Sequence, residues 1–437
     1  MFRNPTPYLI IRLTRNISEK SVCHLNIPIL QATHRFLQTS ALPQMAAQTT
    51  ISSNRETRSS RDATTKVKTA ILMMNMGGPE SDSIEDSEKF LLALFKDRDI
   101  IKMPFQKFLG PWIAKRRAPN IKAKFDQIGG DPLHHWSVRQ GDGIVEALDR
   151  LSPETAPHKA YPCFRYTCPE IAECVEQLEK DKAERVVLLS KYPQYSCSTT
   201  GSSLNEIARY CVKEKRHLEE KPVQRWSLID RWPLSSAIVD VYADRIKEEL
   251  QKLPEDIRDQ TVLLFSAHSI PIWMVERGDD YTGEVGGTVQ AVLSKLERKN
   301  PYSLVWQSKV GPVAWQGPQI EVAIEGFIKN GHKHFMVIPI AFVNEHIETL
   351  HELDIEYGQE LKEKLKFETF ARCPAVNDHP KFFSGMAEMI KKHLDSRETI
   401  SAQMRRRCPN CTSDHCKLTR DWLQKLDKVN CELADWQ

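Results

Sequence analysis

Short apolar runs alternate with helix-length segments along the chain from residue 66 onward. Eight runs have the length and apolar content of buried β-strands, and they lie at residues 67–74, 159–164, 185–190, 224–229, 261–267, 303–307, 334–340 and 368–371. Strands separated by helices form βα units, whose strands pair in parallel. The pattern therefore predicts an α/β fold with two doubly wound domains. Each domain would hold a four-stranded parallel sheet flanked by helices, with a cleft between the domains.

The chain length and charge set further bounds. At about 150 residues per domain, 437 residues leave room for two or three domains. A polar segment at 213–222 marks the predicted boundary, so we expect domains at residues 64–222 and 223–395, followed by an extension at 396–437. The formal charge of +3 is nearly balanced, and no basic stripe interleaved with aromatic residues indicates nucleic-acid binding. No apolar run approaches the roughly 20 residues of a membrane-spanning helix.

The first 63 residues differ from the rest in composition. Residues 1–61 hold eight Arg or Lys residues against two acidic ones, and they are rich in Ser, Thr and Gln. This composition is typical of a mitochondrial transit peptide, and a plain basic tail is the alternative. Thiols in the mitochondrial matrix stay mostly reduced, so we do not interpret the 11 cysteines as a disulfide framework.

Polar segments follow several of the predicted strands. In open parallel sheets, ligands bind beyond the carboxyl ends of the strands. His268 follows one apolar run, and because histidine exchanges protons near neutral pH it suits either a general base or an ordinary structural role. His346 and Glu348 follow another run and could bind zinc together with His268, although no HExxH pattern is present. A glycine turn at 75–79 follows the first strand and matches neither phosphate-loop pattern.

Four glutamates, which we call the acidic ridge, follow at spacings of three, four and four residues: Glu345, Glu348, Glu352 and Glu356. This spacing places them on one face of a predicted helix. Like charges four residues apart oppose helix formation by about 0.2–0.5 kcal/mol per pair, so a continuous ridge indicates a cation or protons that balance it. A solvated helix face is the alternative.

Residues 90–117 are largely apolar, are interrupted by Pro104 and Pro111, and are closed by Lys115, Arg116 and Arg117. We expect residues 90–113 to form either a core helix followed by an irregular loop or an exposed apolar lip. A lip would meet a membrane surface or a flat hydrophobic ligand, while the basic residues would hold anionic groups.

Three cysteines lie within nine residues near the C-terminus, because Cys408, Cys411 and Cys416 belong to the segment CPNCTSDHC. Thiolates at this spacing bind zinc or an iron–sulfur cluster, and either needs a fourth ligand. His415 adjoins Cys416, which makes simultaneous ligation awkward. A distant cysteine is the better candidate, and Cys197 is one of several.

Nine segments together resemble the ferrochelatase family, and in particular its animal mitochondrial members with a C-terminal 2Fe–2S cluster. They cover nearly everything from residue 69 to 416 and read AILMMNMGGPE, IAKRRAPN, APHKAYPCFRYTCP, YPQYSCSTTGSSLN, IDRWP, LLFSAHSIP, NPYSLVWQSKVGP, PIAFVNEHIETLHELDIEYGQ and CPNCTSDHC. The resemblance implies a chelatase-like fold and insertion of Fe2+ into protoporphyrin IX with release of two protons, the last step of haem biosynthesis. It also implies a homodimer in peripheral contact with the matrix side of the inner mitochondrial membrane, where the lip would take up a hydrophobic substrate.

Carried onto this sequence residue by residue, the resemblance implies roles for individual side chains. His268 would accept protons, with His346 and Glu348 as partners in proton removal or metal delivery, and Glu345, Glu352 and Glu356 would form a polar conduit. The porphyrin would contact Met76, Arg116, Arg117, Phe125, Asp131, Arg165, Tyr166, Trp306 and Trp315. The 2Fe–2S cluster would be held by Cys197, Cys408, Cys411 and Cys416.

Three positions depart from the family pattern. Glu345 stands where many animal members carry Asp, Asn120 where Lys is common, and Phe125 where Tyr is expected near the porphyrin. A carrier of porphyrin or iron, or an iron sensor built on the same cleft, is the alternative function, and it would not need His268 as a base. A zinc oxidoreductase would need a nicotinamide site, for which the chain has no GxGxxG turn.

Overall fold

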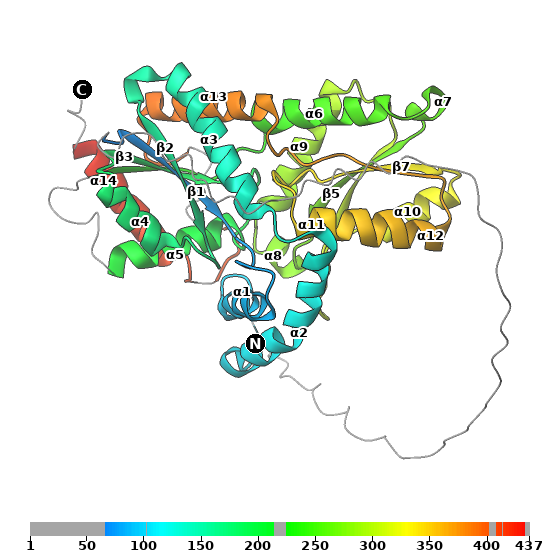
Figure 1. The fold of residues 1–437 in the computed structure, drawn as a ribbon, viewed down its shortest axis with the longest axis horizontal. Helices are drawn as coiled ribbons and strands as arrows, with labels where there is room; N and C mark the ends of the chain where they lie inside the picture. The colour runs from blue at the N-terminus through cyan, green and yellow to red at the C-terminus, as the bar shows by residue number, and fades with distance from the viewer. Residues whose placement is uncertain (1–65, 102, 214–223, 402–407, 413, 433–437) are drawn as a thin grey trace, which may run out of the picture. The chain divides into compact units, whose positions relative to one another are not determined.

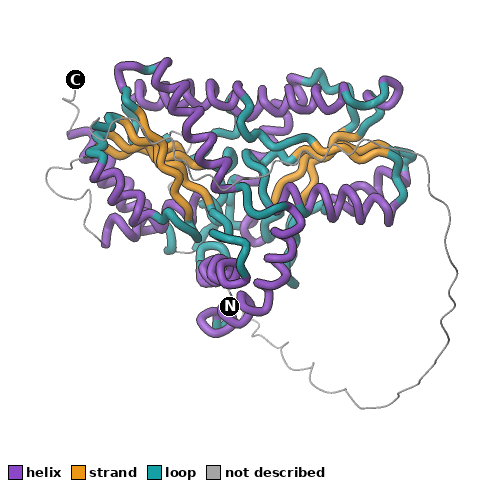
Figure 2. The backbone as a smooth tube through the Cα atoms, in the orientation of Figure 1, coloured by secondary structure: helices purple, strands orange, loops and turns teal. Residues whose placement is uncertain are grey.

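The computed structural model describes residues 66–101, 103–213, 224–401, 408–412 and 414–432. Within them, the eight predicted strands form two four-stranded sheets, and every pairing is parallel (Figure 2). The sheet orders are β2–β1–β3–β4 and β6–β5–β7–β8. The strands are β1 (Thr69–Asn75), β2 (His158–Phe164), β3 (Arg185–Ser190), β4 (Arg225–Ile229), β5 (Val262–His268), β6 (Tyr302–Gln307), β7 (His334–Ile338) and β8 (Thr369–Arg372). The predicted fold class is therefore confirmed.

Helices cover both faces of each sheet (Figure 1). On the first sheet, α3 and α13 lie on one face, and α4, α5 and α14 lie on the other. On the second sheet, α6 and α9 lie opposite α10 and α12. The helices are α1 (Ile84–Lys96), α2 (Gln106–Ile128), α3 (Leu133–Leu151), α4 (Ile171–Lys180), α5 (Thr200–Lys213), α6 (Ser236–Gln251), α7 (Glu255–Arg258), α8 (Ile272–Glu276), α9 (Tyr281–Lys295), α10 (Ile320–Lys329), α11 (Ile347–Leu350), α12 (Lys362–Leu365), α13 (Pro380–Ser396) and α14 (Lys417–Glu432).

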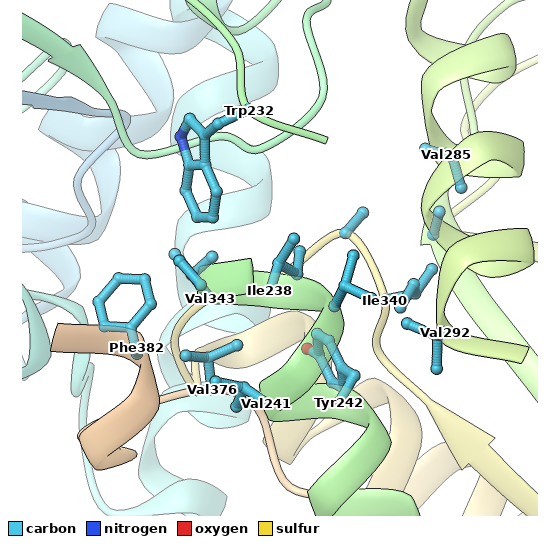
Figure 3. Close-up of a cluster of buried hydrophobic side chains, with 14 of the residues drawn as sticks. Trp232, Ile238, Val241, Tyr242, Val285, Val292, Ile340, Val343, Val376 and Phe382 are labelled. Carbon is cyan, nitrogen blue, oxygen red and sulfur yellow. The ribbon is translucent and has the colours of Figure 1, made fainter. Parts of the chain in front are cut away.

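The central strands β1, β3, β5 and β7 are almost entirely apolar because both of their faces are buried. In β5, Leu263 and Phe265 face one apolar cluster, whereas Val262 and Leu264 face another. The first of these clusters joins the two halves of the molecule, since side chains of both sheets contribute to it. Figure 3 shows its centre, where Tyr242 lies beside Ile340. The Tyr242 hydroxyl lies 2.5 Å from the carbonyl oxygen of Pro339, which fixes the chain just beyond β7.

The predicted domain boundary at 213–222 lies too early for the first sheet. Strand β4 follows that segment, yet it pairs with β3 along five residues. The C-terminal elements also return to the first half, because α13 packs on α3 and α14 packs on α5 and β4. Hydropathy alone could not assign β4, since a run of five residues carries no information about which neighbour it pairs with.

Helices α1 and α2 pack against each other and form the region predicted as a lip. Helix α2 continues through Pro111, which the sequence had suggested would break it. Small residues at four-residue intervals, Gly110, Ala114 and Ala118, let α1 approach closely, and this packing offsets the lost hydrogen bond. The opposite side exposes large apolar side chains, Phe105, Phe108 and Trp112 at 78%, 79% and 59% exposure. Both expectations are therefore met in part, by a packed helix face and an exposed apolar one.

The predicted transit segment, residues 1–63, lies outside the described residues. Among the described helices, none has the length and apolarity needed to cross a bilayer.

Candidate functional site

His268 is the last residue of β5, at the carboxyl edge of the second sheet. Its Nδ1 lies 2.6 Å from the carbonyl oxygen of Ser269. A carbonyl oxygen only accepts hydrogen bonds, so Nδ1 carries the proton and the neutral ring keeps the lone pair on Nε2. That nitrogen lies 3.8 Å from Oε1 of Glu348, and both side chains are about one-third exposed. His268 is thus oriented to accept a proton at Nε2.

Glu352 is held by the end of the neighbouring strand β6. The backbone N–H of Ser308 donates to Oε1 at 2.8 Å and its hydroxyl to Oε2 at 2.5 Å. The side-chain amide of Gln307 donates both to Oε2 at 3.2 Å and to the carbonyl oxygen of Glu348 at 2.9 Å. Burial and the nearby Glu348 carboxylate raise the pKa of Glu352, although the Ser308 hydroxyl opposes the shift. The ionised form of this carboxyl group is therefore less favoured than it would be in water.

The segment that carries the ridge is not one regular α-helix. Helix α11 is followed by a π-helix at Glu352–Leu361, in which the backbone N–H of Glu356 bonds the carbonyl of His351, five residues back. A π-helix has more residues per turn than an α-helix, and it is frequent at functional sites. Glu356 contacts the Nζ of Lys124 at 2.6 Å and Nδ1 of His351 at 3.2 Å. Its charge is therefore balanced by protein groups.

Glu345 stands apart from the other three ridge residues, contrary to the predicted ridge. It precedes α11 and is only 7% exposed, with its Oε1 2.7 Å from Arg372 and 2.9 Å from the N–H of Ala375. The hydroxyl of Thr349 donates to Oε2. Burial opposes ionisation, but Arg372 and these donors lower the pKa of Glu345 overall. The carboxylate is paired internally, and these contacts anchor the chain before α11.

His346 and Asp131 lie near each other, since the His346 charge favours ionisation of Asp131. Burial has the larger effect and raises the pKa of Asp131 to about 6. A Cβ at Gly78 would lie 1.9 Å from Oδ2 of Asp131, so only glycine leaves room for this carboxyl group. The glycine turn after β1 therefore has a packing role. The Nδ1 of His346 is buried and has no hydrogen-bond partner in the described structure.

The two predicted porphyrin-lining tryptophans differ in position. Trp315 lies beside His268, with ring centroids 6.3 Å apart, and its buried Nε1 has no partner among the described residues. Trp306 is only 2% exposed and packs on Tyr281 in the core, so the structure does not place it on an open surface. It lies near the end of β6, where Val305, Trp306 and Gln307 are all buried.

Met76, Arg165 and Tyr166 meet at the carboxyl edge of the first sheet, as predicted for one wall of a site. The backbone N–H groups of Arg165 and Tyr166 both reach the carbonyl of Met76, at 3.2 and 3.1 Å. The Tyr166 hydroxyl donates to Asp97 at 2.7 Å, and the Arg165 guanidinium lies 3.0 Å from the same carboxylate. Arg165 also lines a cavity of about 230 Å³ together with Asn75. Its charge is thus already partnered.

Arg116 and Arg117 are exposed on α2, and Arg116 stacks on Trp112 at 5.5 Å. Phe125 is 6% exposed, contrary to its predicted porphyrin contact. It lies seven residues after Ala118, so it falls on the buried face of the helix. The predicted basic group is therefore available at the surface, whereas Phe125 belongs to the packing of α2.

The four predicted cluster cysteines gather around the loop after α8. The N–H of Asn410 bonds the carbonyl of Arg277 at 3.1 Å, which seats Cys408 and Cys411 there. Arg277 also donates to Sγ of Cys197, and the N–H of Cys197 bonds Asp279 at 2.8 Å. Cys416 accepts a hydrogen bond from Asn205 at 3.6 Å. No three His, Cys, Asp or Glu side chains converge on one metal position within the described ranges.

Several site residues were not identified from the sequence. Gln307 ends β6 and Ser308 follows it, and the edge rule for parallel sheets was the available signal for both. Tyr192 follows β3, and its pKa is raised by burial and by Glu348, which places it toward the second half. Lys124 pairs with Glu356 across 232 positions of sequence, and no local pattern indicates such a partner.

Comparison with known proteins identifies the family of the chain. The model of the family described as "Ferrochelatase" matches residues 68–394. The chain is 48% identical to "Ferrochelatase, mitochondrial" of Bos taurus over 82% of this chain and 85% of that protein. It is 47% identical to the Drosophila melanogaster protein of that name over 83% and 93%, and 48% identical to the Homo sapiens one over 82% and 83%. A solved structure, "SirB from Bacillus subtilis with Fe3+", aligns with TM-score 0.40 and 11% identity over 74% of this chain and 95% of that chain. The chain belongs to the ferrochelatase family.

Proposed function

We propose that His268 is the base in the reaction of this family, the insertion of ferrous iron into protoporphyrin IX. Both pyrrole N–H protons leave the macrocycle as Fe2+ enters, and no electron is transferred, so the protein must accept protons but needs no oxidant. The observation that carries the proposal is the hydrogen bond from Nδ1 of His268 to the Ser269 carbonyl. This bond leaves the Nε2 lone pair for the substrate.

Glu348 and Glu352 continue the path away from His268. Glu348 lies within 3.8 Å of Nε2, near enough to share the accepted proton through a small movement or one water molecule. The raised pKa of Glu352 lets it hold a proton next. Four donors occupy its oxygens and Lys124 balances Glu356, which favours protons over metal ions as the cargo of the ridge. His346, beside Asp131, remains the candidate for contact with the metal.

The lip gives the substrate a route to the site. Phe105, Phe108 and Trp112 form an exposed apolar edge next to Arg116 and Arg117. Protoporphyrin IX has a flat apolar body and two propionates, so these two kinds of side chain match its two parts. Apolar and basic residues together also suit the surface of a bilayer with anionic lipids. Peripheral membrane contact, matrix location and a homodimer follow from the family resemblance.

The chemistry of the C-terminal thiols fits a 2Fe–2S cluster. Four cysteines are the usual ligand set for such a cluster, and Cys197, Cys408, Cys411 and Cys416 are the ones that would hold it. None of the four forms a disulfide within the described residues, and Arg277 supplies a nearby positive charge for the thiolates. When bound, the cluster supplies a one-electron centre and a covalent tie. Metal insertion transfers no electron, so the role of the cluster would be structural. It would fasten the tail, the C-terminal segment that carries Cys408, Cys411 and Cys416, to the loop after α8.

The test compares two histidine variants of the full chain. His268→Ala should lose iron insertion by at least about a hundredfold, the ordinary contribution of a general base, while porphyrin fluorescence is still quenched on binding. His334→Ala is the matched control, because His334 begins β7 and its ring bonds Thr369 at 2.9 Å instead. Turnover by His268→Ala at the control rate would refute the assignment of the base.

A further inference from the structure

Paired polar and charged side chains connect the cysteine-rich tail to the Arg165 wall of the site. The Nδ1 of His415 lies 3.0 Å from Asp99, whose carboxylate lies 3.4 Å from Arg209. Arg209 contacts Glu206 at 2.8 Å, and the same Glu206 oxygen lies 3.3 Å from Arg165. We call this series the ion-pair chain. It begins between Cys411 and Cys416 and ends at a residue bonded to Met76.

The two aspartates of the loop after α1 are the buried members that hold both ends. The side chains of Asp97 and Asp99 are only 2% and 5% exposed. The N–H of Asp99 donates to Oδ1 of Asp97 at 2.7 Å, which couples the two positions. Burial opposes ionisation of Asp97, but Arg165, Ser202 and Tyr166 together lower its pKa. Leaving a buried carboxylate without its partner costs free energy, so the side chains of the ion-pair chain are held in one arrangement.

Helix α5 connects the two ends. Ser202, Glu206 and Arg209 lie four and three residues apart, so they share one face of the helix. Asn205 on the same helix donates to Sγ of Cys416 and accepts a hydrogen bond from Thr419 at 2.6 Å. Figure 1 shows α5 lying beside α14, the helix that follows the tail. A displacement of the tail is therefore transmitted to α5 at two points.

We propose that Asp99 and Asp97 are positioning residues, which couple the arrangement of the tail at residues 408–412 and 414–416 to the orientation of Arg165 and Tyr166. The inference rests on the proposed porphyrin-binding role of these two residues. When the tail is in place, Asp99 is satisfied by both His415 and Arg209, and Glu206 is left to hold Arg165. When the tail moves, Arg209 becomes the main partner of Asp99 and shifts away from Glu206. The affinity for porphyrin then depends on a segment that never contacts it, and by linkage porphyrin binding stabilises the tail.

The test uses the dissociation constant of protoporphyrin IX, measured by fluorescence quenching of the full-length protein without added iron. His415→Ala and Asp99→Asn should weaken binding by about threefold or more, the scale of a partly exposed ion pair, with kcat unchanged. His415→Gln, which keeps a donor for Asp99, should restore wild-type affinity. Asp421→Asn is the matched control, because it breaks the exposed Lys417–Asp421 pair on α14 and no part of the ion-pair chain.

A double-mutant cycle identifies the route. Glu206→Gln interrupts the ion-pair chain next to Arg165, so adding His415→Ala to it should weaken binding no further. Multiplied effects would show independent sites and overturn the proposal, as would wild-type affinity in both His415→Ala and Asp99→Asn. Glu206 is one-third exposed, so Glu206→Gln keeps the test available if Asp99→Asn fails to fold. Wild-type protein that makes no haem would refute the function, whereas active wild-type protein with unchanged variants would refute only the coupling.

Discussion

Lys191 offers a quantitative test of how the two halves are joined. It follows β3, is only 2% exposed, and donates to the Oε1 of Gln140, with its Nζ 5.4 Å from the Phe382 ring centroid. Gln140 in turn donates to the carbonyl of Val343 at 2.9 Å, so this contact holds the loop that leads to His346. Burial lowers the pKa of Lys191 to about 7. The fold therefore favours the neutral amine.

The sign of the pH effect follows from proton binding. Between about pH 7 and 10.5 the unfolded chain binds more protons at Lys191 than the folded chain does, so the penalty for burying the amine shrinks as pH rises. With about 1.36 kcal/mol per pKa unit, the penalty is about 4 kcal/mol at pH 7 and about 2 kcal/mol at pH 9. Lys191→Met removes it, and Gln140 keeps a donor in Asn344 at 2.9 Å.

Urea unfolding followed by tryptophan fluorescence measures the effect. We expect Lys191→Met to be more stable than the wild type at pH 7, with a difference that falls by about 2 kcal/mol at pH 9. Comparing the two proteins at each pH cancels the titration of all groups that they share. A difference that is the same at both pH values, or a less stable variant at pH 7, would refute the reasoning.

Three further substitutions test other parts of the structure. Arg372→Met leaves the buried Glu345 carboxylate without its cation and should cost about 3–5 kcal/mol in urea unfolding at pH 7, and less at pH 5, where the carboxylate can be protonated. Trp422→Ala removes a side chain that is 1% exposed from the packing of α14 and should cost about 3–5 kcal/mol by the same method. Gly78→Ala places a Cβ against Asp131 and should cost about 1–3 kcal/mol and weaken porphyrin binding, measured by fluorescence quenching.

Each of these substitutions has a control elsewhere in the chain. Lys122→Met breaks an exposed helix pair with Asp126 and should cost less than about 0.5 kcal/mol. Leu418→Ala shortens a side chain on α14 that is 38% exposed. Gly326→Ala adds a Cβ within α10 that meets nothing within 4 Å, so it should be neutral or stabilising. Equal losses in a variant and its control would contradict the specific contact invoked.

The sequence predicted the strands well because the central ones are almost unbroken apolar runs, as expected when both faces are buried. It misplaced β4 because pairing is decided by tertiary contacts rather than by the run itself. The edge rule for parallel sheets identified His268 and Glu348 correctly as neighbours, since their separation is 3.8 Å.

Other site details depend on contacts between distant segments, which hydropathy cannot report. Glu345 lies three residues before Glu348 and so fits the helical spacing of the ridge, but its carboxylate pairs with Arg372 from β8. The π-helix changes the turn at Glu352, and no residue pattern in the segment indicates it. Trp306 and Phe125 are aromatic residues, which occur both in ligand-binding walls and in cores. In the structure both side chains are buried in the core.

The most direct test of the central claim counts protons during metal insertion. Wild-type protein is mixed anaerobically with protoporphyrin IX and Fe2+ in weak buffer, and haem absorption and a pH indicator are followed together. The account predicts two protons released for each haem formed, and neither signal from His268→Ala, which still binds porphyrin. Haem formation by His268→Ala at the wild-type rate would contradict it.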